Sequence, residues 1–77
     1  MVLLDANDGM VVKILGIKGG RGLESKCRQL GICPGDCAVI IRHAPFNGPL
    51  LIEVGGRDIA LGRGVASKII VEATKCA

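Results

Sequence analysis

Residues 30–36, with the sequence LGICPGD, constrain the fold more than any other stretch, because a helix must end there and a strand must begin. Leu23, Cys27 and Leu30 have the spacing that places three apolar side chains on one helical face. Gly31 follows at the position where a left-handed residue commonly ends a helix, because glycine has no Cβ to clash. The pattern therefore predicts a helix that ends at Leu30.

The residues after Gly31 predict a sharp change of direction. Ile32 should pack back onto Cys27, which is the usual apolar contact at such a helix end. Pro34 cannot continue a helix, and Pro34 with Gly35 suits the two central positions of a type II turn. The residues that follow are apolar and β-branched, so a strand should begin at once, and its direction relative to the helix is tightly fixed.

Composition places the chain among small globular domains. The 77 residues are 49% hydrophobic and include one aromatic, Phe46, so we expect a single domain over residues 1–77 with an aliphatic core. The net charge of +3 comes from interspersed acidic and basic residues, which is typical of a solvated surface. Residues 1–4 are too few for a signal peptide, and no apolar run reaches the ~20 residues of a membrane span. We expect a cytoplasmic protein that does not insert into the membrane.

Alternating apolar residues and turn signals predict five short strands. Val12 and Ile14 should point inward from the first strand, and Ile69 and Val71 from the last. A glycine-rich loop over residues 16–22 should lead into the helix. The predicted elements are a strand over residues 10–15, a helix over 23–30, strands over 37–43 and 50–54, a strand containing Ile59 and Leu61, a helical turn over 64–67 and a strand over 68–72.

The hairpin between the third and fourth strands admits two registers. A two-residue loop of Gly55 and Gly56 places Ile52 opposite Ile59, although it also brings two acidic side chains face to face. A four-residue loop places Ile52 opposite Leu61 instead. Both registers keep the apolar face intact, and the turn chemistry of two glycines favours the shorter loop.

These elements predict a mainly β fold, a small SH3-like antiparallel barrel of about five strands with one short α-helix between strands one and two. A short helical turn before the last strand is a feature of such barrels. Four motifs then occur in order, namely LGIxPG at residues 30–35, APxxGP at 44–49, IAL at 59–61 and AxxIxV at 66–71. Together they resemble the ferrous-iron transport protein A (FeoA) family over about residues 9–72. The chain departs from the family pattern at Ala38, where a larger aliphatic residue is common, and in its four cysteines.

The resemblance implies a small cytosolic accessory protein of ferrous-iron uptake and not an enzyme. Its implied partner is FeoB, a large membrane protein that imports ferrous iron and carries a GTP-hydrolysing domain. A similar domain lies at the C-terminus of iron-dependent repressors. The alternative function is therefore a stand-alone domain that modulates an iron-dependent transcriptional repressor. Homo-oligomerisation stays open.

The cysteine pattern does not indicate a closed metal site. Cys27, Cys33, Cys37 and Cys76 form no C-x-x-C pair. Cys33 and Cys37 flank a turn, so they are the two weak candidates for Fe²⁺ or Zn²⁺, with a shell that a second subunit or the partner would complete. His43 should share a strand face with Cys37 but lie about 20 Å from it. We expect reduced, structural thiols and no required cofactor.

No motif indicates catalysis or nucleic-acid binding. The glycines at residues 19–22 open a helix, where backbone N–H groups can hold an anion, but the phosphate-binding motifs are absent and a structural turn is favoured. No nucleophile with a base and no close carboxylate pair stand out. Phe46 alone cannot supply the stacking platforms of a nucleic-acid module.

The partner-binding prediction rests on apolar residues that the core does not need. If Ala38 and Ile40 face the core, then Val39 and Ile41 lie on the other side of the same strand. Either the helix and the glycine-rich loop cover them, or they form an exposed patch that docks onto the transporter or a second copy. The candidate partner-binding residues are Val39, Ile41, Arg42, His43, Phe46 and Leu51.

Overall fold

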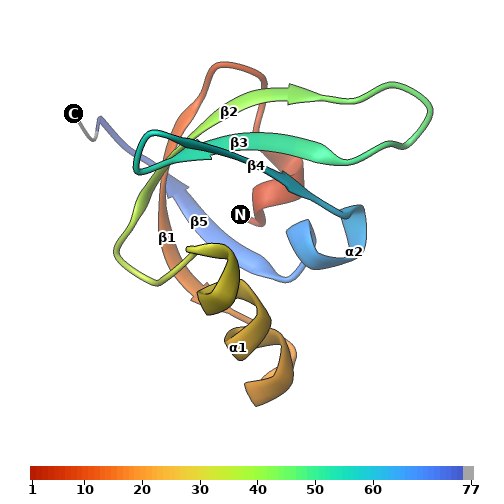
Figure 1. Ribbon diagram of the computed structural model, residues 1–77. Helices are drawn as coiled ribbons and strands as arrows, with labels where there is room; N and C mark the ends of the chain where they lie inside the picture. Colours follow the sequence, from red (N-terminus) through yellow and green to blue (C-terminus); the bar gives the residue numbers. More distant parts are fainter. Residues whose placement is uncertain (76–77) are drawn as a thin grey trace.

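Five antiparallel strands curl around one apolar core in the computed structural model, which describes residues 1–75 (Figure 1). In chain order the elements are the 3₁₀ helix η1 (Leu3–Asp5), β1 (Val11–Ile17), α1 (Gly20–Leu30), β2 (Cys37–His43), β3 (Leu50–Val54), β4 (Arg57–Leu61), α2 (Arg63–Ala66) and β5 (Ile69–Ala73). The strands are hydrogen-bonded in the order β4-β3-β2-β1-β5. The predicted mainly β fold, with one helix between the first two strands, is confirmed. Within these 75 residues, no helix is long and apolar enough to cross a bilayer.

Inward-facing side chains from all five strands form the core. Val12 and Ile14 of β1, and Ile69 and Val71 of β5, are fully buried as predicted. Leu3 is also fully buried, and η1 packs against β5 and α2, so the N-terminal segment completes the core. Among the described residues no polar or charged side chain is buried. The stability of the barrel therefore comes from aliphatic burial, at ~1.5–3 kcal/mol for each large side chain.

The helix end at Gly31 has the predicted geometry. Gly31 has a φ of +90°, in the left-handed region. Its N–H donates to the Arg28 carbonyl at 3.0 Å, and the Ile32 N–H donates to the Cys27 carbonyl at 2.9 Å. These are the two hydrogen bonds of a Schellman motif. Ile32 and Cys27 both belong to the buried core, so the apolar side of this helix end is also as predicted.

The turn after the helix ties the chain to β1. The Asp36 N–H donates to the Cys33 carbonyl at 3.1 Å, and Gly35 has a φ of +95°, which confirms the predicted type II turn. The Asp36 carboxylate accepts the Cys33 N–H at 3.0 Å. The Gly35 N–H donates to the Ile14 carbonyl at 2.7 Å. The six residues between α1 and β2 are therefore held by hydrogen bonds within the turn and to β1.

The β3–β4 hairpin has the shorter of the two predicted loops. Ile52 lies opposite Ile59, and Gly55 and Gly56 have φ values of +60° and +80°, as a type I′ turn requires. This register sets Glu53 opposite Asp58. Both side chains are exposed, so water screens their repulsion and the favourable turn decides the register.

The bounds of β2 and β3 are as predicted, but some boundaries of the other elements differ from the predictions by one to three residues. The helix begins at Gly20 instead of Leu23. The first N–H groups of a helix have no intrahelical partner, and the side chains of its first turn, residues 20–22, are exposed. Apolar periodicity therefore does not detect that turn. The first strand ends two residues later than predicted, the helical turn starts one residue earlier, and the last strand begins and ends one residue later.

A β-bulge in β2 changes the side-chain pattern near the end of that strand. The pairing passes from Ile40 opposite Ile52 to Arg42 opposite Leu51, so Ile41 is the extra residue of the bulge. Beyond a bulge, inward and outward positions exchange. Arg42 therefore lies on the outer face of the sheet beside Leu51.

The same bulge turns His43 toward the inside of the barrel. His43 lies opposite Leu50, which is buried. Cys37, before the bulge, lies opposite the exposed Lys13 on the outer face. The prediction that His43 and Cys37 share a face is therefore wrong, because strict alternation takes no account of a bulge.

Candidate functional site

The outer face of β2 exposes apolar side chains. Val39 and Ile41 are 36% and 40% exposed, whereas Ala38 and Ile40 on the same strand are buried. The explanation that α1 and the glycine-rich loop cover these two side chains is therefore wrong. We use the name β2–β3 face for the four predicted docking residues that the structure brings together here, which are Val39, Ile41, Arg42 and Leu51.

Neighbouring residues define the border of the β2–β3 face. Val11 of β1 lies directly opposite Val39 and is half-buried, so it extends the apolar surface onto a third strand. Glu53 of β3 lies opposite Val39 on the other side. Val11 was not among the predicted docking residues, although its outward position in β1 follows from simple alternation.

Phe46 does not lie on this face but in the connection between β2 and β3, which extends away from the barrel (Figure 1). Its side chain is fully exposed. Phe46 and Asn47 have φ values of +59° and +58°, and the Gly48 N–H donates to the Pro45 carbonyl at 3.1 Å. A left-handed backbone costs a residue with a side chain ~1–2 kcal/mol. The turn thus presents an aromatic ring to solvent from a strained backbone, a feature that clusters at functional sites.

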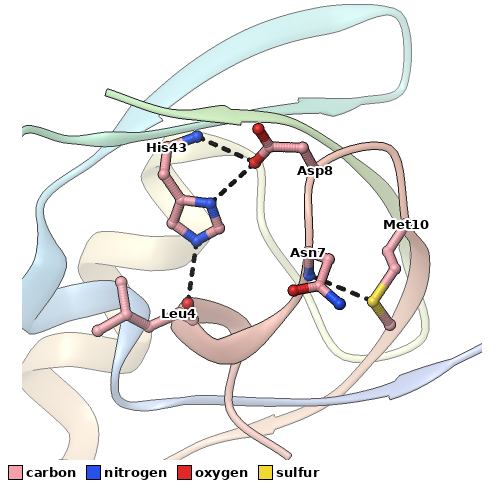
Figure 2. Close-up of polar contacts among 5 residues, drawn as sticks. All are labelled: Leu4, Asn7, Asp8, Met10 and His43. Carbon is pink, nitrogen blue, oxygen red and sulfur yellow. Dashed lines mark hydrogen bonds and ion pairs between the residues drawn. The ribbon is translucent and has the colours of Figure 1, made fainter. Parts of the chain in front are cut away.

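His43 faces the N-terminal segment instead of the outer surface (Figure 2). Its Nδ1 lies 2.9 Å from Oδ1 of Asp8, and its Nε2 lies 3.0 Å from the Leu4 carbonyl oxygen. The hydrogen bond with Asp8, followed by the one with the Leu4 carbonyl, raises the pKa of His43 above its ordinary value of 6.5. Asp8 and Leu4 were missed as partners, because the sequence contains no signal for the bulge that turns His43 toward them.

The cysteines do not form a metal site among the described residues. Cys27 is fully buried, and burial raises the pKa of its thiol. Cys27 and Cys33 are free thiols, but Cys37 is disulfide-bonded, so the expectation of reduced thiols is wrong for Cys37. The pairing of Cys33 with Cys37 as metal ligands is not available in this state. Within residues 1–75, no group of three or more His, Cys, Asp or Glu side chains could hold a metal ion. Cys76 lies outside the described residues.

A pocket of about 290 Å³ lies between α1, the end of β1 and the turn after α1. Two charged residues one helical turn apart on α1, Glu24 and Arg28, contribute to its wall together with the free thiol of Cys33. The remaining lining residues are Gly16, Ile17, Ile32 and Pro34. The pocket shares no residue with the predicted docking set. It was missed because its walls come from three separate parts of the chain.

Comparison with known proteins places the chain in a family. The FeoA domain model matches residues 1–73. A relative from Methanocaldococcus jannaschii, described as an Fe(2+) transport protein A, is 39% identical over 67 residues, which cover 87% of this chain and 79% of the relative. The crystal structure of an iron uptake regulatory protein (FeoA) has a TM-score of 0.88 at 27% identity, with 96% of each chain covered.

Two less similar structures share the fold. One is an FeoA from Stenotrophomonas maltophilia in complex with zinc, described as a prokaryotic SH3 domain protein, with a TM-score of 0.78, 21% identity and coverage of 94% of this chain and 89% of the other. The manganese regulator SloR has a TM-score of 0.85 at 22% identity, and the match covers 96% of this chain but 34% of the regulator. The predicted SH3-like barrel is confirmed, and with the family model matched over residues 1–73 this protein belongs to the FeoA family of ferrous-iron transport proteins.

Proposed function

We propose that this protein is a cytoplasmic accessory factor of ferrous-iron uptake that acts by binding a FeoB-type, GTP-hydrolysing membrane transporter, without catalysing a reaction itself. Family membership supports the link to ferrous iron. The observation that carries the binding proposal is the exposure of Val39 and Ile41 on a strand whose neighbouring side chains form the core. Exposed apolar side chains gathered on one face are typical of interaction sites.

The β2–β3 face has the anatomy of a docking surface. Val39 and Ile41 give it an apolar centre, and Arg42 lies beside them as a charged group at the border. An arginine at a border suits a partner with an acidic side chain at the matching position. Phe46, fully exposed on a neighbouring loop, supplies a rigid aromatic anchor of the kind that often dominates binding energy.

Ile41→Asp should remove the interaction without unfolding the protein. A carboxylate at the centre of an apolar contact loses burial and must be desolvated, so we expect the affinity for the GTP-hydrolysing domain of FeoB to fall about tenfold or more. The matched control is Leu15→Asp, because Leu15 is 47% exposed on β1, belongs to no predicted site and receives the same charge. A pull-down or titration with the purified FeoB domain measures both. If the affinity fell equally in both variants, or fell in neither, the result would contradict a role for the β2–β3 face in binding.

We also propose that the chain needs no bound metal for this function. Cys33 is a free thiol and Cys37 is disulfide-bonded, so the two candidates do not offer a pair of thiolates. We expect calorimetric titration of the purified protein with Zn²⁺, and with Fe²⁺ under anaerobic conditions, to show no saturable one-to-one binding at micromolar metal. Cys33→Ser is the control variant. Tight stoichiometric binding that disappears in Cys33→Ser would overturn this proposal.

A second candidate function is modulation of a metal-dependent transcriptional repressor, because SloR contains a region with the same fold. A pull-down from cell extract with the folded protein as bait separates the two candidates. Recovery of a GTP-hydrolysing transporter supports the first candidate, and recovery of a repressor supports the second. Self-association through the β2–β3 face would instead appear as a dimer in sedimentation.

A further inference from the structure

Both ring nitrogens of His43 lie against oxygen atoms that can only accept a hydrogen bond. One is the carboxylate oxygen of Asp8, 2.9 Å from Nδ1, and the other is the backbone carbonyl of Leu4, 3.0 Å from Nε2 (Figure 2). The same carboxylate oxygen also accepts the backbone N–H of His43 at 3.2 Å. The ring therefore bridges the end of β2 to two points in the N-terminal segment.

A neutral imidazole cannot make both contacts. It carries one N–H, so one nitrogen would present its lone pair to an oxygen lone pair at about 3 Å. With the proton on Nε2, the unprotonated Nδ1 would face the Asp8 carboxylate. With the proton on Nδ1, the unprotonated Nε2 would face the Leu4 carbonyl. Only the imidazolium, which donates from both nitrogens, satisfies the observed geometry.

We propose that His43 is a proton-dependent clamp, whose protonated ring fastens the N-terminal segment, residues 1–9, to the end of β2. Loss of the proton removes one of the two hydrogen bonds and leaves a repulsive contact. The two contacts link His43 to residues that lie 35 and 39 positions earlier in the sequence. The clamped segment carries the fully buried Leu3, and Val2 forms a bridge with Ile70 of β5, so release would loosen the barrel at this end.

The groups around the ring favour its protonated form over the neutral one. The hydrogen bond with Asp8 has the largest effect, and it raises the pKa of His43 together with the Leu4 carbonyl. Partial burial and the charge of Arg63 on α2 act in the opposite direction but are outweighed. Leu50, which lies opposite His43 on β3, carries no charge. The proposal does not depend on the proposed function, since every group in the clamp lies within this chain.

The first test is an NMR titration of the ring. His43 is the single histidine of the chain, so its ring resonance needs no assignment. We expect a titration midpoint above 6.5 in the wild type and a shift back toward 6.5 in Asp8→Asn, which removes the charge but keeps the shape. Asp5→Asn, a matched change within η1, should leave the midpoint unchanged. A wild-type midpoint at or below 6.5, or an Asp8→Asn midpoint equal to that of the wild type, would overturn the clamp.

The second test is the pH dependence of stability. Because the folded pKa lies above the unfolded value of 6.5, the stabilisation is fully present below that pH and is lost as the pH rises through the folded pKa. The urea concentration at the unfolding midpoint of the wild type should therefore fall as the pH is raised above 6.5, whereas His43→Gln should lose this dependence. An identical pH dependence in the two proteins would contradict the proposal. Both readouts are independent of FeoB binding.

Discussion

Ile40→Asp is expected to unfold the protein, whereas Ile41→Asp, one residue further along the same strand, should leave its stability almost unchanged. Ile40 is fully buried and lies opposite Ile52 in the core. An unpaired carboxylate at that position costs ~3–5 kcal/mol or more. A chain of 77 residues has a free energy of unfolding of roughly 4–12 kcal/mol, so this loss is comparable with its whole stability. Ile41 is 40% exposed and can hold a hydrated carboxylate.

Urea denaturation followed by circular dichroism measures both variants. Ile40→Val is the control for lost volume, because it removes one methylene from the same site without adding charge and should cost only ~0.5–1.5 kcal/mol. If Ile41→Asp unfolded as readily as Ile40→Asp, the β2–β3 face would be covered in solution. A stable, folded Ile40→Asp would mean that the strand has another register.

Local chemistry explains why much of the fold was predictable. The bounds of β2 and β3 agree with the sequence prediction at both ends, because turn residues bracket each strand. Gly31 and Gly35 adopt the positive φ values that their positions demanded. The β3–β4 register follows from two adjacent glycines, whose preferred turn outweighs the pairing of two exposed acidic residues.

Features that depend on distant parts of the chain were not predictable. The bulge at Ile41 leaves no mark in the sequence, because the side chains on both sides of β2 are apolar up to that point. The contacts of His43 with Asp8 and Leu4 follow from that bulge. The burial of Leu3 depends on where η1 packs once the strands have closed around the core.

The sequence left open whether Val39 and Ile41 are covered or exposed, and the position of α1 explains why they are exposed. The helix α1 packs against β1 and lies at the bottom of the view in Figure 1, whereas β2 and β3 lie at the top. Val39 and Ile41 therefore stay exposed. Sequence periodicity identifies the apolar face of a helix but does not say which part of a sheet that face covers.

Gly31→Val should destabilise the protein through the backbone of the helix end. Gly31 has a φ of +90°, and a β-branched residue held in that region costs ~1–3 kcal/mol. A Cβ at this position would also meet the guanidinium of Arg57, which lies directly over the glycine at the C-terminal end of α1. The arginine is flexible and would move aside, losing its interaction with the helix dipole, worth ~0.3–1 kcal/mol. Urea denaturation should show the sum of both effects.

Gly35→Val separates the two contributions. Gly35 has a φ of +95°, but a Cβ there would meet no atom within 4 Å, so this variant should lose only the backbone contribution. The difference between the two valine variants reports the displacement of Arg57. That difference should vanish when both are made in an Arg57→Ala background, because the side chain in the way is then absent. Wild-type stability in Gly31→Val would contradict the Schellman geometry of the helix end. It would also contradict the inference that this helix end fixes the direction of β2 relative to α1.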